Sequence, residues 1–343
     1  MDKLNFASDY TQGAHPAIIR ALTETNMEFT PGYGTDEICE RARDRIRLAC
    51  GAPEAEVWFL SGGTQTNMTV LDAILQKYEG VISAETGHVS AHEAGAIEFT
   101  GHKVLPLPQE RGKLSPDDMQ RYLQSFFSDE NRDHMVMPGM VYLSQPTEYG
   151  TLYSLEELRR IRALCDEFSL KLYVDGARLA YALASPENDV SLADLAALCD
   201  VFYIGGTKCG AMFGEAVVLP RGETIPHFLT IIKQHGALLA KGWMLGLQFD
   251  ALFTDGLYER IGAHAIQTAS MLQALFLQKG YPLLFRSPTN QIFVVLENER
   301  LAALAEYVSF SFWERLDEGH TVVRFATSWA TREEDLRQLA ELL

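Results

Sequence analysis

The sequence lacks the features that mark membrane, secreted and nucleic-acid-binding proteins. No apolar run approaches the roughly 18 residues of a membrane-spanning helix, and the N-terminal residues show no apolar secretion signal. The five cysteines are odd in number and show no CxxC spacing, which predicts reduced thiols in a cytoplasmic protein. Positive charge is scarce too, and the net charge is −17. This charge argues against binding to nucleic acid or to an anionic membrane surface.

What is present is typical of a globular enzyme. The chain has 343 residues, of which 47% are hydrophobic and 22% charged. This length exceeds the roughly 250–300 residues at which a single core stops growing, so we expect two parts that share a cleft. Apolar runs alternate with amphipathic stretches up to about residue 280, which predicts an α/β fold with βαβ units. The remainder has the texture of a small α+β unit.

Two apolar segments in the middle of the chain end abruptly in charged residues. Residues 170–174 lead into Asp175 and Arg178, and residues 201–205 lead into Lys208. Such runs predict buried parallel strands, and open α/β sheets hold their ligands at the carboxyl ends of their strands. A lysine and a carboxylate at such ends suit pyridoxal 5'-phosphate (PLP), which needs a Schiff-base lysine and an acid against its pyridine nitrogen. Taken alone, Asp175 and Lys208 also fit a structural salt bridge.

A glycine turn near residue 62 predicts an anion site. Residues 57–60 form a short apolar strand that runs into Gly63 and Thr64 and then into a helix. A strand, a glycine turn and a helix N-terminus together present several backbone N–H groups to a phosphate. The turn is neither a Walker A loop nor GxGxxG, and many α/β folds have a similar first turn.

Two histidines and one arginine each leave two interpretations open. His88 and His92 lie four residues apart, which suits a metal pair, but no third ligand has zinc-like spacing and HExxH is absent. A single imidazole stacked on a planar cofactor ring is the better interpretation. Arg324 interrupts the apolar strand expected at 321–327, and a buried guanidinium without an anion is costly. Its partner is either a structural carboxylate or the carboxylate of a substrate.

Taken together and in order, the motifs resemble the low-specificity threonine aldolases of the β-eliminating lyase group. The resemblance spans nearly the whole chain and keeps the approximate spacing. It rests on Ser8-Asp9, Tyr33-Gly34-Thr35-Asp36, Gly63-Thr64-Gln65-Thr66-Asn67, His88 with Glu93-Ala94-Gly95, Asp175-Gly176-Ala177-Arg178, Thr207-Lys208, Thr289-Asn290 and Val323-Arg324.

The resemblance implies a fold and an assembly. The fold is the type I fold of PLP enzymes similar to aspartate aminotransferase, with a large, mostly parallel seven-stranded sheet. The expected PLP-binding domain comprises residues 13–250, and residues 1–12 and 251–343 form the small α+β domain. A homo-oligomer, either dimer or tetramer, is expected, with the active site at a subunit interface.

The resemblance also implies roles for residues around the cofactor. Lys208 would hold PLP covalently, Asp175 would pair with its pyridine nitrogen and His88 would stack on its ring. The phosphate would bind to Gly63 and Thr64. Further cofactor contacts are expected from three residues, namely Thr147, Arg178 and Lys241.

The substrate would lie over the cofactor. Ser8, Arg178 and Arg324 would hold its carboxylate, and Tyr33 and Tyr149 would line the rest of its pocket. Fixing the carboxylate fixes which bond at Cα stands perpendicular to the ring. For a β-hydroxy-α-amino acid that bond is Cα–Cβ, and a base must remove the β-hydroxyl proton. The candidate bases are His88 and His134.

The sequence departs from the family pattern in three places. Tyr10 follows Asp9 where the family commonly has threonine. Residues 145–149 read Gln-Pro-Thr-Glu-Tyr where the family tends to have Glu-Asn-Thr-His-Asn, so only Thr147 is kept. The glycine- and arginine-containing phosphate anchor is altered at 235–242, where Lys241 would supply the cation. Because Glu148 and Tyr149 would face the substrate side chain, the preferred aldehyde stays open.

The resemblance implies cleavage of L-threonine, L-allo-threonine or related amino acids to glycine and an aldehyde. Three other PLP reactions use the same lysine and acid but align another bond, namely β-elimination, transamination and racemisation. A PLP-binding protein with little catalysis, or a metal hydrolase built on His88 and His92, are the alternatives from other classes.

Overall fold

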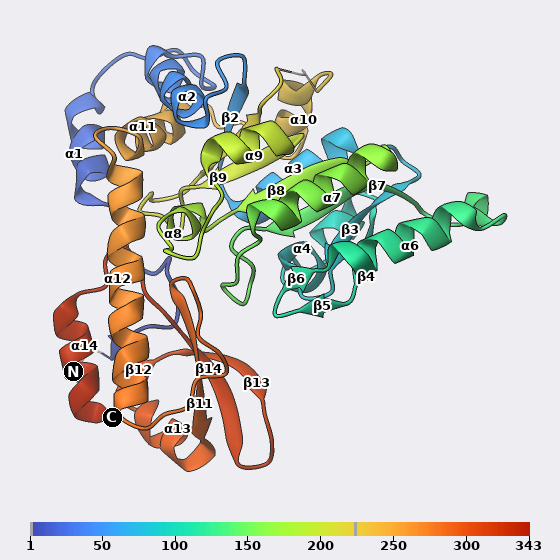
Figure 1. Cartoon of the computed structure of the whole chain (residues 1–343). Helices are drawn as coiled ribbons and strands as arrows, with labels where there is room; N and C mark the ends of the chain where they lie inside the picture. Colours follow the sequence, from blue (N-terminus) through green and yellow to red (C-terminus); the bar gives the residue numbers. More distant parts are fainter. Residues whose placement is uncertain (1–2, 223–224) are drawn as a thin grey trace.

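A seven-stranded sheet forms the centre of the larger part of the molecule. The computed structural model describes residues 3–222 and 225–343 (Figure 1). All strands run parallel except β10, which is antiparallel to both of its neighbours. The mostly parallel seven-stranded sheet predicted above is therefore confirmed. Its strand order is β2 (Glu56–Leu60), β10 (Glu215–Leu219), β9 (Val201–Gly205), β8 (Lys171–Gly176), β7 (Met137–Ser144), β3 (Glu79–Ala84) and β4 (Lys103–Leu107).

The sheet is buried on both faces, which explains the nearly continuous apolar runs of its strands. Along β7, Val141 and Leu143 enter the core on one face, whereas Met140 and Tyr142 enter the core on the other. Helices of the first face are α1 (Pro16–Thr25), α2 (Glu37–Cys50), α6 (Pro116–Ser128), α7 (Leu155–Glu167), α8 (Leu179–Leu183), α9 (Leu192–Leu198) and α11 (Trp243–Leu252). Helices of the second face are α3 (Gly63–Ile74), α4 (His88–Ala91), α5 (Ala96–Phe99) and α10 (Phe228–Gln234).

Serine caps start several of the helices. Ser115 accepts hydrogen bonds from the first turn of α6, and Ser154 forms a capping box at α7. Ser191 caps α9 in the same way. The N-cap of α3 is Gly62, which offers no side-chain oxygen. The backbone N–H groups at the start of α3 therefore remain available to another acceptor.

A second, smaller sheet lies at the other end of the molecule. Its three antiparallel strands are ordered β11 (Gln291–Glu297), β14 (His320–Ala326) and β13 (Ser311–Arg315), and α13 (Asn298–Leu304) and α14 (Glu333–Leu342) accompany them. The N-terminal β1 (Leu4–Asn5) pairs in parallel with β12 (Val308–Ser309). The strand β1 and the C-terminal helix α14 thus both lie in this smaller part of the molecule (Figure 1). The domain bounds at 12/13 and 250/251 stay a prediction.

The long helix α12 (Leu257–Gln278) belongs to both parts. Near its start, Tyr258 and Ile261 pack into the core of the large sheet, and near its end, Leu272 and Phe276 pack into the core of the small one. Figure 1 shows the helix running between the two parts. The large and small sheets are therefore held by a shared element rather than by a loose linker.

Three short elements lie beside the large sheet, namely the hairpin of β5 (Gln109–Glu110) and β6 (Lys113–Leu114) and the 3₁₀ turn η1 (Arg132–His134). Within residues 3–222 and 225–343, no helix combines the length and the apolar character that crossing a membrane requires.

Candidate active site

Two adjoining cavities open at the carboxyl ends of β7, β8 and β9. The inner cavity has a volume of about 400 Å³ and borders the large sheet. The outer one has a volume of about 610 Å³ and extends to β13 of the small sheet. Six residues contribute to the lining of both cavities, namely Tyr10, His88, His92, Glu148, Arg178 and Lys208. The shared lining makes them one continuous cleft between the two parts of the molecule.

Lys208 lies at the centre of this cleft, three residues after the end of β9. Burial and the positive charge of Arg178 lower the pKa of Lys208, although the carboxylates of Asp9, Asp175 and Glu215 oppose the shift. A lowered pKa increases the neutral fraction of the amine. The neutral form is the one that attacks a carbonyl group, so the site suits Schiff-base chemistry.

Asp175 lies one residue before the end of β8 and borders the inner cavity. Its Oδ2 accepts hydrogen bonds from the Tyr142 hydroxyl at 2.6 Å and from Asn67 Nδ2 at 3.1 Å, and its Oδ1 accepts from the N–H of Ala177 at 2.9 Å. Burial opposes ionisation, but the His88 charge and these hydrogen bonds lower the pKa of Asp175 below its ordinary value. The carboxylate is therefore held ionised in a nearly water-free position beside the inner cavity.

His88 starts α4 and is connected to Asp175 through hydrogen bonds. Its Nδ1 lies 2.7 Å from Oε1 of the buried Glu93. The same Glu93 oxygen accepts from Asn67 Nδ2 at 2.7 Å, and Asn67 also bonds Asp175. This series of hydrogen bonds fixes the orientation of the imidazole at the wall of the cleft. His92 caps the end of the four-residue α4, and its ring centroid lies 5.9 Å from that of His88.

The N-terminus of α3 borders the inner cavity through Gly62, Gly63 and Thr64. It is the uncapped start described above, so its N–H groups and the positive end of the helix dipole face a site without a side-chain acceptor. A Cβ atom added at Gly63 would lie only 3.3 Å from the Tyr203 hydroxyl. The glycine thus leaves space where a phosphate would approach the backbone.

Arg178 lies in the cleft, but its guanidinium is already engaged. Its Nε and NH2 bond the two carboxylate oxygens of Asp9 at 2.6 and 3.1 Å. Asn290 supports the same carboxylate at 2.9 Å. From the sequence we expected Arg178 to bind the substrate carboxylate, whereas in the structure its guanidinium is paired with Asp9. Its positive charge still borders both cavities.

The pair of Asp9 and Arg178 gives a prediction for stability. Burial opposes ionisation of Asp9, but the charges of Arg178 and Lys208 lower its pKa from 3.8 to about 2. We expect Asp9→Asn to reduce the free energy of unfolding by about 3 kcal/mol, because it leaves a buried guanidinium without its anion. Urea denaturation at pH 7 measures this, with the exposed Asp133→Asn as the control.

The same pair predicts a pH dependence. A depressed folded-state pKa stabilises the protein above the unfolded value of 3.8, and the stabilisation is lost as the pH falls towards 2. The wild type should therefore lose more stability than Asp9→Asn over this interval. Parallel pH profiles of the two proteins would contradict the assignment.

Arg324 has no carboxylate partner among the described residues, so a structural ion pair does not explain it. It bonds the side-chain oxygen of Gln291 at 3.0 Å and the Ala7 carbonyl at 3.3 Å, and it lies over the Trp313 ring. Burial and the nearby Arg178 lower its pKa to about 10, so it stays cationic at neutral pH. The neighbouring Ser8 Oγ is buried without a described hydrogen-bond partner. This arrangement leaves a cation in the outer cavity for a carboxylate ligand.

Five predicted site residues do not line the cleft, and the first of them is Ser8, whose hydroxyl oxygen is buried. His134 lies on η1, which precedes the first residue of β7, so the eight residues of that strand, about 26 Å, separate it from the carboxyl ends. Tyr33 and Lys241 are exposed, and Lys233 lies over the Tyr33 ring. Thr147 is buried and bonds Thr151 at 2.7 Å. Tyr149 does line the outer cavity, against Trp313.

The structure adds residues that sequence reasoning did not assign. The hydroxyls of Tyr142, Tyr173 and Tyr203 lie near Asp175 and Asn67. The sequence could have indicated them, because each of three neighbouring strands carries a tyrosine that points to the same face of the sheet. Glu215 borders the inner cavity, where burial raises its pKa to about 8. The sequence could have indicated Glu215, because it is a carboxylic acid within an otherwise apolar run. Glu148 borders both cavities.

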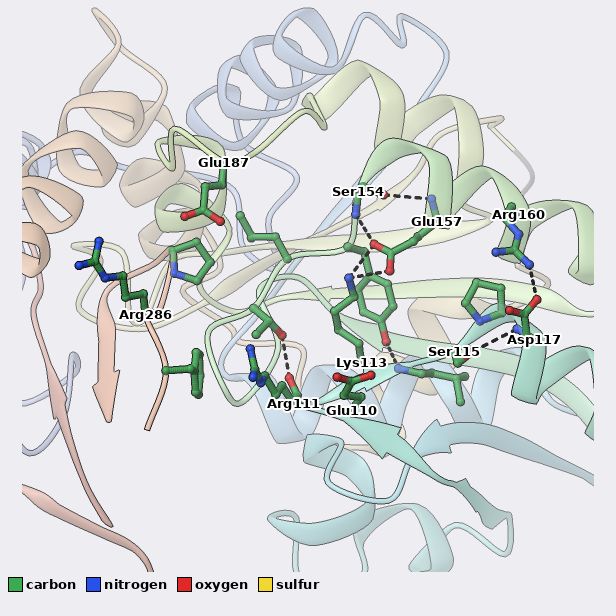
Figure 2. Close-up of a pocket in the computed structure, with 17 residues that line it drawn as sticks. Glu110, Arg111, Lys113, Ser115, Asp117, Ser154, Glu157, Arg160, Glu187 and Arg286 are labelled. Carbon is green, nitrogen blue, oxygen red and sulfur yellow. Dashed lines mark hydrogen bonds and ion pairs between the residues drawn. The ribbon is translucent and has the colours of Figure 1, made fainter. Parts of the chain in front are cut away.

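A separate groove of about 590 Å³ lies outside this cleft, beside the starts of α6 and α7 (Figure 2). Its charges largely neutralise one another. Figure 2 shows Lys113 directed at Glu157 and Arg160 at Asp117, and both are ion pairs. Ser115 and Ser154 cap the two helices there. The groove thus offers no set of groups like that of the cleft.

The residues of the cleft fit PLP. Lys208 offers an amine of lowered pKa, and Asp175 offers an ionised carboxylate that can keep a pyridine nitrogen protonated. The uncapped start of α3 suits the phosphate. Among the described residues, no group of three or more His, Cys, Asp and Glu side chains is arranged to hold a metal ion, including around His88 and His92.

Comparisons with known proteins agree with this fit. The β-eliminating lyase family matches residues 5–299. The low-specificity L-threonine aldolase of Pseudomonas sp. (strain NCIMB 10558) is 33% identical over 339 residues, which cover 98% of this chain and 95% of that relative. A solved threonine aldolase structure from Leishmania major superimposes with a TM-score of 0.95 at 44% identity, covering 98% of each chain.

A more distant structure shows the fold alone. An aspartate aminotransferase double mutant of Thermus thermophilus has a TM-score of 0.73 at 17% identity and covers 100% of this chain and 92% of its own. Fold and site together define a PLP-dependent lyase of fold type I. The chain belongs to the β-eliminating lyase family, which confirms the resemblance seen in the sequence.

Proposed function

We propose that the protein cleaves β-hydroxy-α-amino acids, such as L-threonine or L-allo-threonine, to glycine and an aldehyde. The observation that carries the proposal is the cleft itself. The outer cavity is lined by an amine of lowered pKa, a cation without a described carboxylate partner and a partly buried carboxyl, namely Lys208, Arg324 and Glu148. The relatives named L-threonine aldolase support the same reaction.

The chain's own residues would hold the cofactor in one orientation. Lys208 would bind it covalently, Asp175 would accept the pyridine N–H, His88 would lie against the ring, and Gly63 and Thr64 would donate backbone N–H groups to the phosphate. Bound in this way, PLP supplies an electron sink for the electron pair of the breaking bond at Cα. The hydrogen bonds from Tyr142 and Asn67 keep Asp175 in position for this contact.

The substrate would be oriented by its two ends. Arg324 would bind its carboxylate, and the charge of Arg178 also borders this cavity. Ser8 follows Ala7, whose carbonyl accepts from Arg324, so its hydroxyl would have to turn towards the substrate to take part. Tyr149 and Trp313 form an aromatic wall at the side-chain end, with ring centroids 4.9 Å apart. Held at both ends, the substrate would present its Cα–Cβ bond for cleavage. This alignment favours aldol cleavage over β-elimination, transamination and racemisation, which break other bonds.

We also propose a homo-oligomer, dimer or tetramer, with the cleft at a subunit interface. In its own subunit, the inner cavity contains no cation besides Arg178 and Lys208 among the described residues. Tyr33 and Lys241 are exposed and would reach the partner's cleft. Met27 and Phe29 are exposed apolar side chains close to Tyr33 in the sequence, as an interface requires. Free, buried cysteines support a cytoplasmic location.

The test is the release of aldehyde from L-threonine, L-allo-threonine and L-phenylserine, followed by NADH-coupled reduction. We expect aldehyde and equimolar glycine from at least one of them. Absence of aldehyde from all three, together with pyruvate from L-serine, would contradict aldol cleavage and favour β-elimination. A protein that binds PLP without turnover would support the non-catalytic alternative.

The role of Arg324 gives a further prediction. We expect Arg324→Gln to raise KM for L-threonine about a hundredfold, or about 2.7 kcal/mol, because the substrate carboxylate loses its cationic partner. Steady-state kinetics measure this, and the visible spectrum of the bound cofactor should not change. Arg315→Gln on the neighbouring β13 is the exposed control. An unchanged KM would contradict the assignment.

A further inference from the structure

Glu148 is a partly buried acid of the cleft to which the proposed cofactor contacts give no role. It follows β7 in the loop that also carries Tyr149, and it borders both the inner and the outer cavity. It therefore lies where the cofactor site passes into the space for the substrate side chain.

One carboxylate oxygen of Glu148 is firmly held. Its Oε1 accepts the backbone N–H of His88 at 2.9 Å and the hydroxyl of Ser144 at 2.7 Å. These two donors come from different elements, α4 and β7, so they fix the position of the carboxyl group across the cleft.

The other oxygen has no donor. Oε2 is buried and makes no hydrogen bond to any described residue. A buried polar atom left unsatisfied costs about 1–3 kcal/mol, so a bound group that donates to it is favoured. Burial, with a smaller contribution from the charge of Asp175, also raises the pKa of Glu148, which makes it a stronger base than an exposed carboxylate.

We infer that Glu148 is the base that takes the proton of the substrate β-hydroxyl, an inference that rests on the proposed function. The O–H bond breaks and its proton moves to Oε2. The electrons of that bond form the C=O of the leaving aldehyde, and the electron pair of Cα–Cβ stays with Cα. In the reverse direction, protonated Glu148 returns the proton to the aldehyde oxygen as the bond forms.

His88 is less suited to this step. Its Nδ1 is bonded to Glu93, and this contact leads through Asn67 to Asp175 rather than to the substrate side chain. An imidazole that stacks on the cofactor presents its face, whereas its nitrogen lone pairs lie in the plane of the ring. His134 lies at the far end of β7 and cannot reach the substrate in its own subunit.

The test is Glu148→Gln, which keeps an acceptor oxygen for the His88 N–H and Ser144 but cannot take a proton. We expect kcat for L-threonine cleavage to fall by about 10²- to 10³-fold. Exchange of the α-proton of glycine in D₂O, followed by NMR, should be unchanged, since glycine has no β-hydroxyl. The control is Glu187→Gln, which removes the same charge from the separate groove of Figure 2.

The pH profile separates a base from a purely structural acceptor. Because the ionised form of Glu148 is active, wild-type kcat/KM should fall as the pH drops through its raised pKa. In Glu148→Gln this acidic limb should disappear. An unchanged kcat with the limb intact would overturn the inference, and so would a parallel loss of cleavage and glycine exchange. If the wild type itself releases no aldehyde, the proposed function fails instead.

Discussion

Lys208→Ala should abolish aldehyde release from every substrate, with kcat lower by about a thousandfold or more. No other lysine among the described residues lines the cleft, so no neighbour can replace the amine. The visible absorbance of the lysine-bound cofactor should vanish as well, even when PLP is added. Absorbance spectra and the coupled assay measure the two effects.

The control for this variant is Lys77→Ala, which removes an exposed lysine after α3. It should match the wild type in both measurements. Retention of the absorbance band in Lys208→Ala would show that another group holds the cofactor, and the assignment of the cleft would then be wrong.

Asp175→Asn should have the second-largest effect, a fall in kcat of about a hundredfold. The amide is isosteric, and it can still accept the Ala177 N–H, so the fold should persist. It carries no charge, so it cannot hold the pyridine nitrogen in its protonated form. The variant should still bind PLP, because Lys208 is unchanged, but with an altered visible spectrum.

The carboxyl group of Asp175 should not titrate in the neutral range. In the wild type, hydrogen bonds and the His88 charge keep the pKa of Asp175 low, so the carboxylate stays ionised across the neutral range. If Asp175→Asn kept the kcat of the wild type, the proposed role of this carboxylate would be contradicted. Asp133→Asn is the exposed control.

The sequence predicted the sheet and the centre of the site because both follow local patterns. Apolar runs that end in charge located Asp175 and Lys208 at the carboxyl ends of β8 and β9. The glycine turn at Gly63 located the uncapped start of α3 in the same way. Such signals depend only on neighbours along the chain and on the polarity of parallel strands.

Contacts between distant segments could not be predicted. The fork of Arg178 is taken by Asp9, which lies 169 positions away in the sequence. Glu148 was visible as a departure from the family pattern, but its buried, unsatisfied oxygen depends on how α4 packs against the end of β7. The position of His134, in contrast, could have been predicted. A residue that precedes β7 lies at the amino end of that strand, opposite the carboxyl ends where the cleft opens.

Every proposed role in the cleft depends on PLP bound to Lys208, and borohydride reduction followed by peptide mapping tests this binding most directly. Reduction converts a Schiff base to a stable amine and leaves the pyridoxyl group on the lysine that held it. We predict that the purified protein carries this group on the peptide containing Lys208. A protein that remains unlabelled after incubation with PLP, or that is labelled at a different lysine, would contradict the assignment of Lys208.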